Sequence, residues 1–79
     1  MLKKTYITFG QSHVHSVKGK TFDKDCVACI THDEKVNGRD IAFQLFGKEW
    51  SRSFREGERK LPYMRCFPRG VIEVDEVFI

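Results

Sequence analysis

Two histidines near the start of the chain are spaced so that both could bind one divalent metal ion or act together as an acid–base pair. His13 and His15 lie in the run GQSHVHSVKG, and side chains two residues apart in an extended segment point to the same face. Neutral imidazoles bind divalent metal ions and titrate near neutral pH. Asp23 or Asp25 would supply a carboxylate ligand if a hairpin returned them to the histidines, and that cluster would suit a metal-assisted hydrolase.

The same residues also fit an ordinary structural role. His13 and His15 would then lie on the outward, polar face of an edge strand, and Asp23 and Asp25 would make hydrogen bonds within a turn. The local sequence offers no third ligand beside the two histidines. We therefore favour the structural interpretation, with no cofactor, and keep a divalent metal site as the alternative.

A second set of metal-ligand types is formed by Cys26, Cys29 and His32. If the apolar run 26–31 is a strand, three residues span roughly 10 Å and the two thiols point to opposite faces, whereas zinc requires each sulfur atom at about 2.3 Å. Neither glycine nor proline lies between these cysteines to bend the chain. With Cys66 the chain has three cysteines, an odd number that gives no disulfide framework, and we expect buried free thiols.

Arginine and aromatic residues alternate in the second half of the chain. Residues 47–70 contain seven Lys and Arg against three Glu, and cationic groups mixed with stacking groups are typical of surfaces that bind single-stranded nucleic acid. The expected partner-binding residues are Trp50, Arg52, Arg55, Arg59, Lys60, Tyr63, Arg65 and Arg69. The partner would be nucleic acid or an acidic protein surface. In the alternative interpretation, the aromatic rings turn inward from a half-buried strand and the arginines are simply solvated.

Motifs for covalent and phosphoryl-transfer catalysis are absent from the sequence. There is no glycine-rich phosphate loop, nucleophile elbow or Walker-type sequence, and the serines have no triad context. Phosphoryl-transfer and acyl-enzyme chemistry are therefore not expected, and an enzyme is less expected than a protein without catalytic activity.

Composition indicates a small globular protein. The chain has 79 residues, of which 41% are hydrophobic and 32% are charged, and this length predicts a single domain over residues 1–79. No run approaches the roughly 20 apolar residues that span a bilayer, and the basic start MLKK lacks the apolar segment of a secretory signal. We expect a cytoplasmic protein that makes no membrane contact.

Local patterns predict most of the regular elements. Thr5–Phe9 is β-branched and aromatic and predicts a strand, and His13–Val17 a short second one that ends at a turn over residues 18–20. Thr21 and Phe22 continue after this turn. Cys26–Thr31 is apolar throughout, which is typical of a strand buried on both faces.

The clearest helix signal runs from Asn37 to Gly47. Asn37 suits the N-cap, Asp40 places a negative charge in the first turn, and Gly47 suits the left-handed position that closes a helix. The apolar residues between them, namely Ile41, Ala42, Leu45 and Phe46, share one stripe. A helix over Gly38–Phe46 is expected. An earlier start is the alternative, because Thr31 to Glu34 has capping-box spacing, but it would enclose Gly38 at a cost of about 1 kcal/mol.

The last elements are assigned from one turn. FPRG at residues 67–70 has proline second and glycine fourth, as in a type I turn. This turn predicts a hairpin of Tyr63–Phe67 with Val71–Val74. The pattern of Trp50–Phe54 is ambiguous, and this segment stays unassigned. The order of elements and the short connections favour an α+β fold, with an antiparallel sheet of three to five strands and one short helix packed on one face.

Four segments together resemble small proteins encoded by phages and prophages. They are ITFGQSHVH, GKTFDKDCVACI, GRDIAFQLFG and FPRG. The resemblance covers most of the chain, carries no established activity, and implies a protein that binds a host enzyme, a defence complex or nucleic acid. We therefore expect a small intracellular non-catalytic binding protein that engages nucleic acid or an acidic host-protein surface. The alternatives are the metal site described above and a homo-oligomeric structural protein whose interface buries the spare aromatics.

Overall fold

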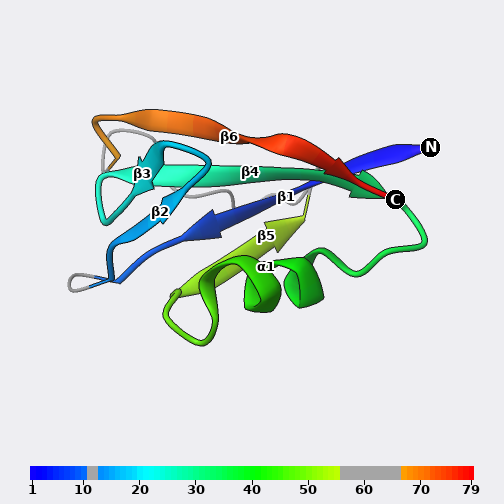
Figure 1. Ribbon diagram of the computed structural model, residues 1–79, viewed down its shortest axis with the longest axis horizontal. Coiled ribbons are helices and arrows are strands. Elements are labelled where there is room, and N and C mark those ends of the chain that lie inside the picture. The colour runs from blue at the N-terminus through cyan, green and yellow to red at the C-terminus, as the bar shows by residue number, and fades with distance from the viewer. Residues whose placement is uncertain (11–12, 56–66) are drawn as a thin grey trace.

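The computed structural model describes residues 1–10, 13–55 and 67–79 and has an α+β architecture (Figure 1). The described elements are β1 (Leu2–Thr8), β2 (His15–Val17), β3 (Lys20–Phe22), β4 (Cys26–Asp33), α1 (Gly38–Phe46), β5 (Arg52–Arg55) and β6 (Gly70–Phe78). Within this part of the chain, no helix is long and apolar enough to cross a bilayer. The α+β prediction is confirmed.

The main sheet has four strands in the order β5-β1-β4-β6. β1 pairs antiparallel with β4 and β5, but β6 pairs parallel with β4, so the prediction of a purely antiparallel sheet is wrong. Short connections favour antiparallel neighbours, whereas the chain between β4 and β6 includes α1 and β5 and returns β6 to the starting end of β4. Both ends of the chain consequently lie at the same end of the sheet (Figure 1).

The turn before β6 forms as predicted, but β6 itself is longer than expected. The Gly70 N–H donates to the Phe67 carbonyl over 2.8 Å. After this turn, β6 continues beyond Val74 to Phe78. Residues 63–66, the expected first arm of the hairpin, lie outside the described residues.

The helix begins and ends where its caps predict. The Asn37 side chain accepts from the Arg39 N–H over 2.9 Å, and Gly47, with a φ of 63°, donates its N–H to the Phe43 carbonyl. The alternative earlier start is wrong, because β4 continues to Asp33. α1 packs on β1 and β4 through the predicted apolar stripe, of which Ile41, Ala42 and Phe46 are buried and Leu45 is partly buried.

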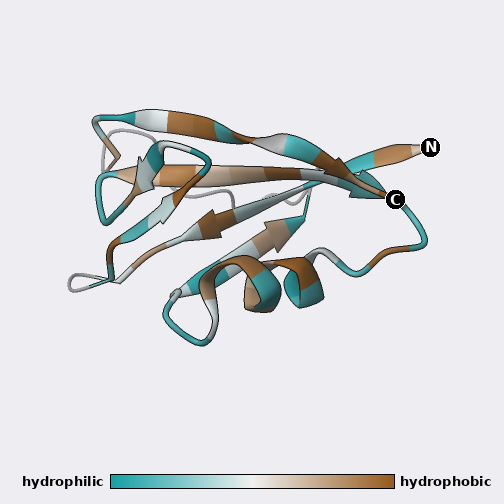
Figure 2. Ribbon diagram, viewed as in Figure 1, coloured by the Kyte–Doolittle hydropathy of each residue, from teal (hydrophilic) through white to brown (hydrophobic). Residues whose placement is uncertain are grey.

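The central strand β4 is buried on both faces, as its apolar run predicts. Each residue from Cys26 to Ile30 is buried. Cys26, Ala28 and Ile30 join Ile7 and residues of α1 in one core cluster. Figure 2 shows β4 as apolar along most of its length, whereas β6 changes repeatedly between apolar and polar.

The hairpin of β2 and β3 forms a separate two-stranded sheet beside β4. Its turn residues Lys18 and Gly19 have φ angles of 51° and 79°, the positive values that a two-residue type I′ turn requires at both positions. The predicted strand His13–Val17 is shorter in the structure, since pairing begins at His15.

Candidate functional site

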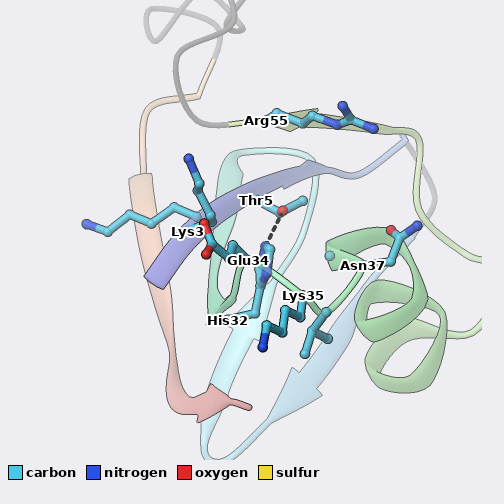
Figure 3. Close-up of a pocket in the computed structure, with 10 residues that line it drawn as sticks. Lys3, Thr5, His32, Glu34, Lys35, Asn37 and Arg55 are labelled. Atoms are coloured by element: carbon cyan, nitrogen blue, oxygen red, sulfur yellow. Dashed lines mark hydrogen bonds between the residues drawn. The ribbon is translucent and has the colours of Figure 1, made fainter. Parts of the chain in front are cut away.

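The start of α1 meets the main sheet at a cavity of about 460 Å³ (Figure 3). β1, β4, β5 and the β4–α1 connection all contribute to its walls. The lining residues are Lys3, Lys4, Thr5, His32, Glu34, Lys35, Val36, Asn37, Gly38 and Arg55. We call this cavity the helix-start pocket.

The floor of the helix-start pocket is a buried polar pair. Thr5 Oγ1 and His32 Nε2 lie 2.7 Å apart, and His32 Nδ1 lies 2.9 Å from the Asp33 carbonyl oxygen. Because a carbonyl only accepts, Nδ1 carries the proton, and Nε2 accepts from the Thr5 hydroxyl. Both ring nitrogens of His32 and the Thr5 hydroxyl therefore have hydrogen-bond partners. The pair is 5% exposed at each residue, so the floor is fixed in place by hydrogen bonds and packing.

Gly38 brings the helix directly onto this floor. A Cβ at Gly38 would overlap the Thr5 side chain and lie 2.9 Å from His32 Nε2. A close approach of backbone to a side chain is one of the uses that only glycine permits. The missing side chain of Gly38 therefore sets how near the first turn of α1 lies to the sheet.

Three cationic side chains surround the pocket on the helix side of the sheet. Lys3 is aligned with His32 and Arg55 with Thr5, and cross-strand partners share a face. Lys35 approaches from the β4–α1 connection (Figure 3), where the Asp33 carboxylate accepts the Lys35 backbone N–H.

The charge around the pocket is unbalanced. Lys4 lies on the opposite face of β1, where its ammonium is 3.9 Å from Glu73, so it adds little positive charge here. Among the described residues, Glu34 is the one acidic residue that lines the cavity. Three cationic side chains and one carboxylate make this a positively charged cavity, which favours an anionic ligand.

The predicted arginine and aromatic residues lie in different parts of the structure. Arg55 lines the helix-start pocket, and Arg52 is exposed on β5 and aligned with Thr8. The Trp50 ring is near the end of α1, and its Nε1 donates to the Gly47 carbonyl over 3.1 Å. The remaining members, Arg59, Lys60, Tyr63 and Arg65, lie outside the described residues.

Arg69 belongs to another region. Its Nη1 is 3.1 Å from the Asp23 carboxylate, and it precedes β6, at the sheet edge opposite β5. Two strands separate it from Arg52 and Arg55. Proximity in sequence therefore grouped residues that the fold places apart.

The four predicted metal ligands do not form a cluster. His15 Nε2 donates to the Glu49 carbonyl over 2.7 Å, and the Asp23 carboxylate accepts the Asp25 N–H and pairs with Arg69. His13 Nδ1 is shielded from solvent and has no partner among the described residues. Over residues 1–10, 13–55 and 67–79, no group of three His, Cys, Asp or Glu side chains is placed to hold a metal ion.

The described cysteines are free and buried, as expected. Cys26 and Cys29 are both enclosed in β4, while Cys66 lies outside the described residues. Burial raises the pKa of the Cys26 thiol, opposed by a hydrogen bond that its sulfur accepts from the Asp23 backbone N–H and by the positive charge of Arg69. A buried thiol that holds its proton is a poor nucleophile and metal ligand.

The pocket was missed from the sequence because its residues are dispersed. From the sequence, Lys3 was considered only as part of the basic N-terminal run and Thr5 only as part of a strand. His32 was considered only with Cys26 and Cys29, as a zinc site that the strand geometry disfavours. One feature of the sequence could have indicated the pocket, namely a polar residue at a core-facing strand position. His32 follows Cys26, Ala28 and Ile30 at every second position of β4, on the face that contacts the core.

Comparison with protein-family models, curated proteins and solved structures found no match to this chain. The expected relationship to phage and prophage proteins therefore stays a prediction.

Proposed function

We propose that this protein is a non-catalytic binding protein for single-stranded nucleic acid. The observation that carries the proposal is a cation–aromatic cluster on the outer side of α1, formed by Arg39, Phe43 and Trp50. We call it the aromatic cluster. It lies beside the edge strand β5, which carries two exposed arginines.

The aromatic cluster offers ring surface in a fixed orientation. The Phe43 and Trp50 ring centroids are 5.1 Å apart in an edge-to-face arrangement, and Phe43 is 46% exposed. The bond from Trp50 Nε1 to Gly47 fixes the indole. Nucleic-acid bases stack on such rings for about 1–3 kcal/mol per base, with little sequence preference.

Positive charge flanks these rings. The Arg39 guanidinium lies 5.8 Å from the Trp50 ring centroid, and Arg52 and Arg55, three residues apart on an edge strand, project toward opposite faces of the sheet. A strand that passes along this edge would meet a cation on either side. The planar guanidinium pairs with phosphate through two hydrogen bonds, which suits it to a nucleic-acid backbone.

The test is the affinity for a fluorescein-labelled single-stranded oligothymidylate, measured by anisotropy over a range of salt concentrations. Arg39→Ala with Arg52→Ala should weaken binding and reduce the slope of log K against log salt, because fewer counterions are released. Phe43→Leu should weaken binding without changing that slope. Lys18→Ala with Lys24→Ala removes the same charge from exposed positions in the β2–β3 hairpin and the turn before β4, and serves as the matched control.

Two results would contradict the proposal. Equal loss of binding in the control would mean that net charge alone is measured. Equal affinity for poly-glutamate, with Phe43→Leu unaffected, would favour an acidic protein partner instead of nucleic acid.

A further inference from the structure

We propose that the helix-start pocket binds a phosphate monoester of nucleotide size. The inference goes beyond the strand binding proposed above, because it rests on a separate cavity with its own cations. Only Arg55 is common to the pocket and to the residues invoked for strand binding.

The charge of the pocket matches a dianion. Among the described lining residues, Lys3, Lys35 and Arg55 contribute three positive charges and Glu34 one negative charge, and the Lys4 ammonium is beside Glu73. A phosphate monoester carries about −1.5 to −2 charges at pH 7. A single carboxylate would leave positive charge uncompensated in the cavity.

The volume of the pocket leaves room for more than an isolated phosphate group. Ligand sites for small organic molecules usually enclose about 300–1,000 Å³, and this cavity of about 460 Å³ falls within that range. The cations of Lys3, Lys35 and Arg55 surround the cavity from three different elements (Figure 3). The phosphate would therefore lie among these side chains, and the esterified group would occupy the rest of the cavity.

The floor supplies polar groups suited to the esterified part. Thr5 and His32 lie at its base, and the Asn37 side chain belongs to its wall at the start of α1. Both ring nitrogens of His32 are used within the floor, so the groups left to bind the ribose or base of a nucleotide are the lone pairs of the Thr5 hydroxyl oxygen and the amide N–H groups of Asn37, whose Oδ1 caps the helix. The same phosphate chemistry occurs in a free nucleoside 5′-monophosphate and at the 5′-phosphorylated end of a strand, and the experiment separates these two sources.

The experiment is an NMR titration of the ¹⁵N-labelled full chain. The backbone amides of Asn37 and Gly38 report on the pocket, and the Trp50 indole N–H reports on the aromatic cluster. The probes are a nucleoside 5′-monophosphate, the matching nucleoside, citrate, and an oligonucleotide with and without a 5′-phosphate. Lys3→Ala with Lys35→Ala is the pocket variant, since both lysines are exposed and Arg55 is left in place. Lys18→Ala with Lys24→Ala is again the charge-matched control.

The expected result is that the monophosphate shifts the Asn37 and Gly38 amides, whereas the nucleoside and citrate do not. The pocket variant should bind the monophosphate roughly ten-fold or more weakly, as expected for lost charge-assisted hydrogen bonds, and the control should bind as the wild type does. If only the phosphorylated oligonucleotide shifts these amides, the phosphate chemistry is supported and its source is a strand end.

Three results would overturn the inference. They are equal shifts with citrate, equal weakening in the control variant, and no shift at Asn37 or Gly38 with either phosphorylated probe. Shifts confined to the Trp50 indole would overturn the pocket while supporting strand binding. Shifts confined to the pocket, with no oligonucleotide affinity in the anisotropy assay, would support the pocket and contradict the proposed function.

Discussion

The layer between α1 and the sheet is filled differently at the two ends of the helix. Near the end of α1, Phe9, Phe22 and Phe46 pack with ring centroids 5.0 to 6.1 Å apart. At the start of α1 the same layer contains Thr5 and His32 and is open to solvent as the helix-start pocket. One sheet face thus forms closed core at one end and a cavity at the other, and the types of inward-facing side chain make the difference.

The histidines of the two ends show the same contrast. His15 packs against Phe9 and Phe46, with centroid distances of 5.7 and 5.2 Å, and donates from Nε2 to a carbonyl. His32 donates to a carbonyl from Nδ1 and accepts at Nε2. The two rings therefore donate to a carbonyl from different nitrogens. At the aromatic end the ring acts as an apolar surface, whereas at the pocket it forms part of a polar floor.

Removing a ring from the closed end should cost the most stability. Phe46→Ala is expected to lower the free energy of unfolding by about 3–5 kcal/mol, from lost burial and the cavity that remains. Urea denaturation measures it, and Phe46→Leu provides a milder variant if the alanine protein does not fold. Phe43→Ala, on the exposed side of the same helix, is the control and should lose much less. Equal losses would mean that the aromatic end is not the main core.

Filling the space above the pocket floor should also destabilise the fold. Helix propensity alone predicts that Gly38→Ala stabilises by up to about 1 kcal/mol, but the added Cβ would overlap Thr5 and His32. We expect a net loss of roughly 1–3 kcal/mol, as for overpacking in general. Gln44→Ala on the exposed face of α1 reports propensity without the clash. A more stable Gly38→Ala protein would show that the helix start does not lie on the floor.

Breaking the hydrogen bond in the floor tests whether it is a coupled pair. Thr5→Val keeps the shape but leaves His32 Nε2 without its donor, at an expected cost of about 1–3 kcal/mol. The double variant Thr5→Val with His32→Leu removes both partners and should lose less than the sum of the single changes. Chemical denaturation of all four proteins completes the cycle, and strictly additive losses would contradict the pairing.

The closed end should also hold a thiol in its neutral form. Because the folded pKa of Cys26 is raised, the unfolded chain releases this proton at lower pH than the folded chain. The Cys26 contribution to stability is therefore fully present below the unfolded thiol pKa of about 8.5, and it decreases as the pH rises beyond that value. Denaturation at pH 7 and pH 9.5 should show a smaller pH effect for Cys26→Ala than for the wild type. An unchanged pH effect would contradict the raised pKa.

Local signals predicted the elements whose partners are near in sequence. Asn37 and Gly47 bound the helix because caps act within one turn, and Pro68 with Gly70 marked a turn for the same reason. The parallel position of β6 depended on a partner strand far away in sequence. The sequence signal for this arrangement was the continuous apolar run of β4, because such runs are typical of strands that are buried on both faces and have parallel neighbours.

The candidate sites were less predictable than the fold. Arg52, Arg55 and Arg69 occur in one stretch of sequence, yet Arg69 lies at the other sheet edge and pairs with Asp23. The helix-start pocket combines Lys3, Lys35 and Arg55 from three separate segments. No periodicity within a segment indicates such an arrangement, because it depends on strand order and on how closely Gly38 lies to the sheet.

The parallel pairing of β4 with β6 has a consequence for how the chain folds. It aligns Cys26 with Gly70 and His32 with Phe78. The two strands can pair only after the long segment between them, which includes α1 and β5, has lost the conformational entropy of loop closure. Contacts so distant in sequence slow folding, and we expect docking of β6 to limit the refolding rate. Until that step, the apolar strand β4 has an open edge that can pair with another chain. Refolding yield should therefore decrease as protein concentration rises, even though the native protein hides that edge.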